Sequence, residues 1–143
     1  LIGKDQSAGD PAKLRVALDE GVTVIAAHAC SYGLMVYERY CRTFLELVRQ
    51  YPNFFADISA LTLPNRFRML LRLRRHPETH DRLLFGTDYP LSVFHLACWG
   101  RLGIKAMAEI VRTKNRFDRQ YLVCKRLGLG FRSFDLLMPH RGE

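Results

Sequence analysis

The sequence contains no long apolar run, no signal-peptide pattern and no low-complexity segment. Crossing a bilayer takes an apolar run of about 20 residues, and none occurs in the 143 residues. The N-terminus has neither the charged nor the apolar region of a secretory leader. We therefore expect a globular chain of the cytoplasm, without a membrane span.

Paired cysteines are also missing. The four cysteines are widely spaced and form no CxxC motif, so neither a disulfide framework nor a cysteine-rich zinc motif is indicated. Packed thiols in a reducing compartment are the expected state. Cys30 follows His28 by two residues; such a cysteine is more often a small packed side chain than a nucleophile.

Acidic residues are scarce relative to basic ones. The chain has 14 Asp and Glu against 22 Lys and Arg, and its net charge is +8 with a pI near 9.7. Such an excess suits an anionic partner, either nucleic acid or an anionic substrate. The densest cluster, residues 66–77, has an apolar and a basic stripe at helical spacing. An amphipathic helix is therefore favoured there over a nucleic-acid patch.

The sequence does contain a regular alternation of apolar strands and amphipathic helices. Asp10 and Pro11 mark the start of a helix that Gly21 closes. Strands are predicted over residues 22–28, 53–59 and 82–88, and further helices over residues 36–52, 64–75, 104–112 and 117–130. Because strand–helix–strand connections place strands in parallel, we predict an α/β fold whose parallel sheet is buried on both faces.

Polar residues end the three predicted strands. His28, Asp57 and Asp88 recur at spacings of 29 and 31 residues, and the carboxyl ends of parallel strands meet at one edge of a sheet. Histidine and aspartate are ligands for Zn²⁺ or a similar divalent ion, which lowers the pKa of a bound water to about 7. The alternative is that these side chains cap helices or bind loop amides.

Three segments, VTVIAAHACSYG, NFFADISAL and RLLFGTDYPL in this order, resemble the amidohydrolase-related family. FGTDYP is the most specific of their motifs. This family comprises metal-dependent (β/α)8-barrel enzymes, both hydrolases and decarboxylases of the aminocarboxymuconate-semialdehyde type. The resemblance covers most of residues 9–92. It implies one partial domain, the C-terminal part of a TIM barrel with about strands 6 to 8, in which residues 1–100 form barrel units and residues 101–143 form closing helices and a tail.

The resemblance also implies roles for individual residues. Asp88 matches the acid that ligates the metal and handles the proton of the attacking water. His28 matches the histidine that orients or deprotonates that water, or contacts the substrate. Asp57, Ser59 and Tyr89 are expected to line the substrate pocket. The implied reaction is attack of metal-activated water on a C–N or C–O bond, or decarboxylation of a metal-chelated carboxylate, with zinc as the expected metal and a small molecule as substrate.

Two features of that family are missing here: a His-x-His pair on the first strand and a histidine on the fifth. The chain also begins with Leu1 rather than Met. We therefore expect a portion of a longer enzyme whose other metal ligands lie upstream. Even with His28 as a second ligand beside Asp88, the chain has fewer than the three protein ligands of a catalytic zinc site. The isolated chain should therefore bind zinc weakly and be inactive. A non-catalytic barrel remnant, a basic nucleic-acid-binding module and a homo-oligomer stay open.

Overall fold

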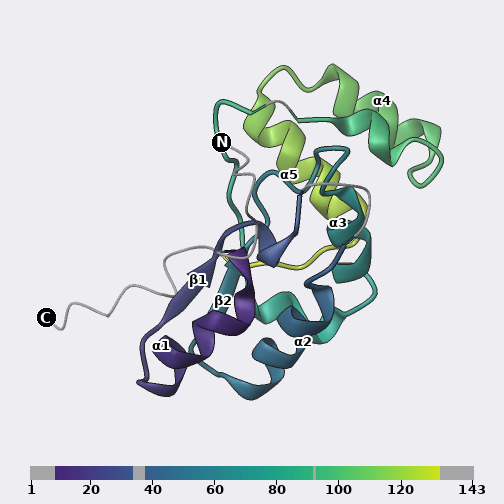
Figure 1. The fold of residues 1–143 in the computed structure, drawn as a ribbon. Helices are drawn as coiled ribbons and strands as arrows, with labels where there is room; N and C mark the ends of the chain where they lie inside the picture. The colour runs from purple at the N-terminus through teal and green to yellow at the C-terminus, as the bar shows by residue number, and fades with distance from the viewer. Residues whose placement is uncertain (1–8, 34–37, 92, 133–143) are drawn as a thin grey trace, which may run out of the picture.

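A short parallel sheet lies at the centre of the fold (Figure 1). This computed structural model describes residues 9–33, 38–91 and 93–132, apart from the side chains of Leu96 and Ala97. The three strands, β1 (Val24–Ala26), β2 (Phe54–Asp57) and β3 (Leu83–Leu84), lie side by side in the order β1-β2-β3. Both pairings are parallel. The predicted α/β class with a parallel sheet is confirmed.

The prediction of a TIM-barrel portion is wrong. The described strands are three, four and two residues long and form one three-stranded sheet. A barrel needs eight strands whose tilt and stagger are matched so that the sheet closes, and nothing in this arrangement points to closure. The alternation of strands and helices predicts parallel pairing, but open sheets share that alternation with barrels.

The first helical segment begins at the predicted cap. The Asp10 side chain accepts a hydrogen bond from the Ala12 N–H at 2.9 Å, and Pro11 takes the first position of a 3-10 turn, η2 (Pro11–Leu14). The turn continues as α1 (Arg15–Asp19). Gly21, at a φ of 77° that glycine adopts without steric cost, follows the end of the helix as predicted.

The connections between strands are amphipathic helices that are shorter than expected. α2 (Cys41–Gln50) lies between β1 and β2, and α3 (Phe67–Leu73) lies between β2 and β3. Residues 34–37, part of the helix predicted over residues 36–52, lie outside the described chain. Three short segments complete this part: η3 (Ala27–Cys30), whose backbone is non-helical at His28 and Ala29, and the 3-10 segments η4 (Pro77–Arg82) and η5 (His95–Cys98).

The core forms between the sheet and these helices. Phe44 of α2 and Phe54 of β2 are fully buried, with ring centroids 5.9 Å apart in an edge-to-face arrangement. All three apolar residues of β2 are buried, as expected of a strand covered on both faces. β1 departs from that expectation, because Ile25 is 42% exposed.

α4 (Ile104–Arg112) and α5 (Arg116–Arg126) lie together at the end of the molecule away from α1 and α2 (Figure 1). Their bounds agree with the prediction, except that α5 ends at Arg126 rather than near Gly130. Gln120 of α5 is 2% exposed and donates a hydrogen bond to the Gly86 carbonyl at 2.7 Å. This bond ties α5 to the segment after β3. Among the described helices, none has the length and apolar character that a membrane span requires.

Candidate functional site

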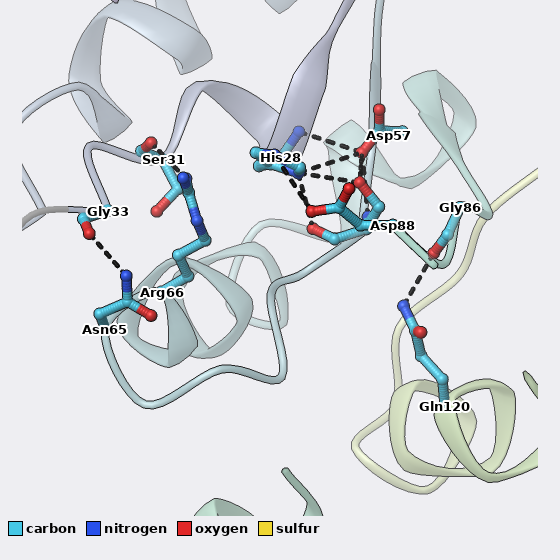
Figure 2. Close-up of polar contacts among 10 residues, drawn as sticks. His28, Ser31, Gly33, Asp57, Asn65, Arg66, Gly86, Asp88 and Gln120 are labelled. Atoms are coloured by element: carbon cyan, nitrogen blue, oxygen red, sulfur yellow. Dashed lines mark hydrogen bonds and ion pairs between the residues drawn. The ribbon is translucent and has the colours of Figure 1, made fainter. Parts of the chain in front are cut away.

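The polar residues that end the strands come together at the carboxyl edge of the sheet. His28 follows β1, Asp57 is the last residue of β2, and Asp88 follows β3. Figure 2 shows the three side chains pointing toward one another. His28 Nδ1 lies 3.8 Å from Asp57 Oδ1, and His28 Nε2 lies 3.6 Å from Asp88 Oδ2. These residues are far apart in the sequence, but the parallel strands bring them together in one group, which we call the His28–Asp57–Asp88 cluster.

Asp57 holds the cluster together. Its Oδ1 accepts hydrogen bonds from the backbone N–H of His28 at 3.0 Å, from the backbone N–H of Ser59 at 3.0 Å and from the Ser59 hydroxyl at 2.5 Å. The sequence left open whether Asp57 lines a pocket or binds loop amides. The structure shows it binding loop amides, and one of those amides belongs to His28.

The backbone around His28 is held in a conformation that L-residues rarely adopt. His28, Ala29 and Cys30 have φ values of 53°, 48° and 60°. In this left-handed region a non-glycine residue costs about 1–2 kcal/mol. Such strain persists where surrounding contacts fix the backbone, and it clusters at functional sites. The bond from the His28 N–H to Asp57 is one of those contacts.

Ser59 determines which nitrogen of His28 carries the proton. His28 Nδ1 lies 3.1 Å from the Ser59 carbonyl oxygen and 2.8 Å from its hydroxyl. A carbonyl only accepts, and the hydroxyl already donates to Asp57, so Nδ1 is the donor. In the neutral ring Nε2 is then an acceptor that faces the Asp88 carboxylate, which is also an acceptor. Two facing acceptors are stabilised by a proton or a cation between them.

Of the two other residues predicted to line the pocket, Ser59 belongs to the cluster and Tyr89 does not. Ser59 is 5% exposed and belongs to the cluster. Tyr89 is 66% exposed, and its ring lies 5.8 Å from that of Phe117 and under the Arg116 guanidinium of α5. Tyr89 therefore contacts α5 rather than the cluster. Gly86 leaves room for the cluster, because a Cβ there would lie 3.2 Å from the Ser59 Cβ.

A cavity of about 390 Å³ opens beside His28. Its lining residues include Asp10 and Lys13 before the sheet, Tyr32, and Arg66. Arg66 donates a hydrogen bond from Nη1 to the Ser31 carbonyl at 2.8 Å, as Figure 2 shows. Burial lowers the pKa of Arg66, while the nearby carboxylates of the site act in the opposite direction. A partly buried cation thus stands in the cavity wall.

Glu38 and Arg66 are site residues that sequence reasoning missed. Glu38 is only 3% exposed and accepts hydrogen bonds from the Ser31 hydroxyl and the Tyr32 N–H, both at 2.8 Å. In the sequence both charges fell within segments read as amphipathic helices with solvated polar faces. The one feature of the sequence related to Arg66 is Gly33. A Cβ at this position would lie 2.5 Å from the guanidinium carbon of Arg66, so a larger residue would displace the arginine.

Comparisons of the chain with protein-family models, with curated proteins and with solved structures found no match. The resemblance to the amidohydrolase-related family therefore stays a prediction. Any function has to be inferred from the geometry of the cluster and its cavity.

The donor atoms of the cluster fit part of a divalent metal site. Two donors that each lie about 2.1 Å from a zinc ion are about 3.4 Å apart in a tetrahedral site, and His28 Nε2 and Asp88 Oδ2 are 3.6 Å apart. The bond from His28 Nδ1 to a carbonyl is the usual outer contact of a ligating histidine. The described residues contain no group of three such ligands, so they supply two.

Cys30 is not activated by its neighbour His28. Burial, with the nearby carboxylates of Glu38 and Asp57, raises the pKa of its thiol to about 12. At pH 8 we expect iodoacetamide to alkylate Cys30 on the order of 10³-fold more slowly in the folded chain than in urea, because the thiolate is that much rarer. The folded-chain rate should rise about tenfold per pH unit up to pH 11. Timed labelling followed by peptide mass spectrometry measures both rates, and fast labelling of folded Cys30 at pH 8 would contradict the burial argument.

Proposed function

We propose that His28 and Asp88 are two ligands of a divalent metal ion, zinc in the first instance, in a metal-dependent hydrolase or decarboxylase. The observation that carries the proposal is the approach of His28 Nε2 to Asp88 Oδ2, which lie 3.6 Å apart. The hydrogen bonds that His28 Nδ1 donates to the Ser59 oxygens leave Nε2 free to bind a cation. The resemblance in the sequence implies Asp88 as a metal ligand and His28 as the residue that orients or deprotonates the water or contacts the substrate. Any further ligand would come from outside the described residues.

The chain's own residues would prepare this site in three ways. Asp57 fixes the loop that carries His28, and Ser59 fixes the ring. The Asp88 side chain is 38% exposed, so its carboxylate can accept a proton from a water at the site. When bound, the metal would supply a water of lowered pKa and polarise a substrate oxygen.

The cavity beside His28 supports a small, anionic substrate. Its volume of about 390 Å³ is sufficient for a small molecule. Lys13 and Arg66 outnumber the one carboxylate that lines the cavity, Asp10, and this small positive excess attracts an anion before the chemical step. We also place the protein in the cytoplasm, which is supported by the four free cysteines, three of them buried.

Zinc should bind the isolated chain weakly and at this pair. With two of the usual four ligands, about half the binding free energy of a structural site gives a Kd of roughly 1–200 µM. In an NMR titration the ring resonances of His28 should shift first. Asp88→Asn should raise the Kd about tenfold or more, because an amide oxygen is a poorer ligand than a carboxylate. Asparagine tolerates the φ of 55° at this position, so the fold should be retained.

Asp81→Asn is the matched control, since Asp81 is an exposed carboxylate on η4. This variant should bind zinc as the unmodified chain does. Two results would contradict the proposal: zinc shifting His76 or His80 while His28 stays unchanged, or tight binding that survives Asp88→Asn.

A further inference from the structure

Among the described residues, five arginines that gather on and beside α3 form no ion pair with a carboxylate, as is also true of several arginines elsewhere in the chain. Arg15, Arg42, Arg49 and Arg126 each lie within 4.0 Å of a glutamate oxygen. Among the described residues, no such ion pair forms at five other arginines: Arg68, Arg72, Arg74, Arg75 and Arg101. Arg72 contacts the Cys41 thiol and Arg101 lies over the Phe67 ring. Their positive charge is left without an anion.

These arginines wall two adjoining hollows on the outside of α3, which lies at the periphery of the fold between α2 and α5 (Figure 1). The hollows measure about 310 Å³ and 340 Å³, and Leu71 and Arg75 line both. No carboxylate is among their lining residues. Leu71, half-buried, is the one apolar side chain between them. We call the five arginines with Leu71 the arginine face.

The helix holds two of these side chains at a fixed spacing. Arg68 and Arg72 lie at i and i+4, so they share one side of α3 about 6 Å apart along its axis, and Arg75 follows two residues after the helix ends at Leu73. The opposite side of α3 is anchored in the core by Phe67, Met69, Leu70 and Leu73, all buried. Because that side is anchored, α3 cannot rotate to relieve the repulsion between its like charges. Binding of an anionic partner would reduce the repulsion between these arginine side chains.

We propose that the arginine face docks an acidic segment of a partner protein, one that carries an apolar side chain between its carboxylates. Each guanidinium presents a planar pair of donors that matches a carboxylate. Leu71 gives the apolar side chain a contact at the centre of the face, where interface anchors contribute most. No aromatic side chain lines either hollow, so the stacking that holds single-stranded nucleic acid is missing. The proposal does not depend on the metal pair.

Fluorescence anisotropy with a labelled peptide tests this docking. The probe is a fluorescein-labelled 12-residue peptide of Glu, Asp and Leu, titrated with the full chain in 50 mM NaCl. We expect saturable binding that the double substitution Arg68→Gln with Arg75→Gln weakens about tenfold or more. Replacing the leucines of the peptide with serine should weaken binding as well, because Leu71 then loses its partner.

Lys105→Gln with Lys114→Gln is the control, because it removes the same charge from exposed positions in and beside α4. Circular dichroism checks that both double variants are folded. The proposal is overturned if the peptide does not bind, if the control weakens binding equally, or if the serine peptide binds as well as the leucine peptide. Tighter binding of a 12-residue oligouridine would also overturn it, in favour of nucleic acid. None of these results bears on zinc binding at His28.

Discussion

Replacing Asp57 with alanine is expected to lower the free energy of unfolding by about 3–5 kcal/mol. The carboxylate accepts three hydrogen bonds, and bonds to a charged group contribute about 1.5–3 kcal/mol each when they are shielded from water. The Asp57 side chain is 20% exposed, and solvent screening therefore lowers the expected loss to about 3–5 kcal/mol, below the sum of three such bonds. Urea denaturation at pH 7, followed by circular dichroism, measures the loss.

Two variants separate the hydrogen bonds from the charge. Asp57→Asn keeps the shape and one acceptor oxygen, and should cost about 1–2 kcal/mol. Asp81→Ala removes an exposed carboxylate and should change the free energy of unfolding by less than about 0.5 kcal/mol. A loss below about 1 kcal/mol for Asp57→Ala would mean that Asp57 is a solvated pocket residue, as its resemblance to a pocket position first implied.

The same substitution should change the site. Without Asp57 the His28 N–H loses its acceptor, and the left-handed φ of 53° loses one of the contacts that hold it. The His28 ring would then sample positions away from Asp88. We expect the weak zinc binding of the chain to fall with the stability, and the ring resonances of His28 to broaden in the NMR spectrum.

The position of the cluster could be predicted from the sequence, but its hydrogen bonds could not. A polar residue at the end of an apolar run is visible as a pattern, and parallel strands bring such ends together. The three bonds of Asp57 depend instead on a loop with three successive positive φ values at His28, Ala29 and Cys30. Residue preferences disfavour that conformation, so tertiary contacts, rather than the local sequence, determine it.

Buried charge was the second limit of sequence reasoning. The burial of Glu38 could not be predicted from helical periodicity, because it results from the segment around Ser31 and Tyr32, which donates hydrogen bonds to the carboxylate. Helical periodicity predicts that a glutamate lies on the solvent face of a helix, and it does not predict that a loop covers that face. α4 and α5 were predicted closely because helical periodicity is a local signal, whereas the Asn115 cap of α5 was not predicted. Closure of a barrel is the least local property of all, and that prediction failed.

Phe44→Ala is expected to cost about 3–5 kcal/mol of unfolding free energy, the range measured for large aromatic truncations in cores. Phe44 has no exposed surface, and its ring packs edge-to-face against Phe54 of β2. Removing it leaves a cavity between α2 and the sheet that neighbours can fill only in part. Because typical domains are stable by 5–15 kcal/mol, this single change could leave much of the chain unfolded at 25 °C. Urea denaturation monitored by circular dichroism measures the change.

Phe117→Ala is the matched control for that prediction, since Phe117 is 42% exposed on α5. It should cost less than about 1 kcal/mol. A similar loss at both positions would show that α5 contributes to the stability as much as the core around β2. If Phe44→Ala alone is destabilising, zinc binding should weaken with it. β2 packs on Phe44 through Phe54 and ends at Asp57, so a loosened β2 would no longer hold the carboxylate against the His28 amide.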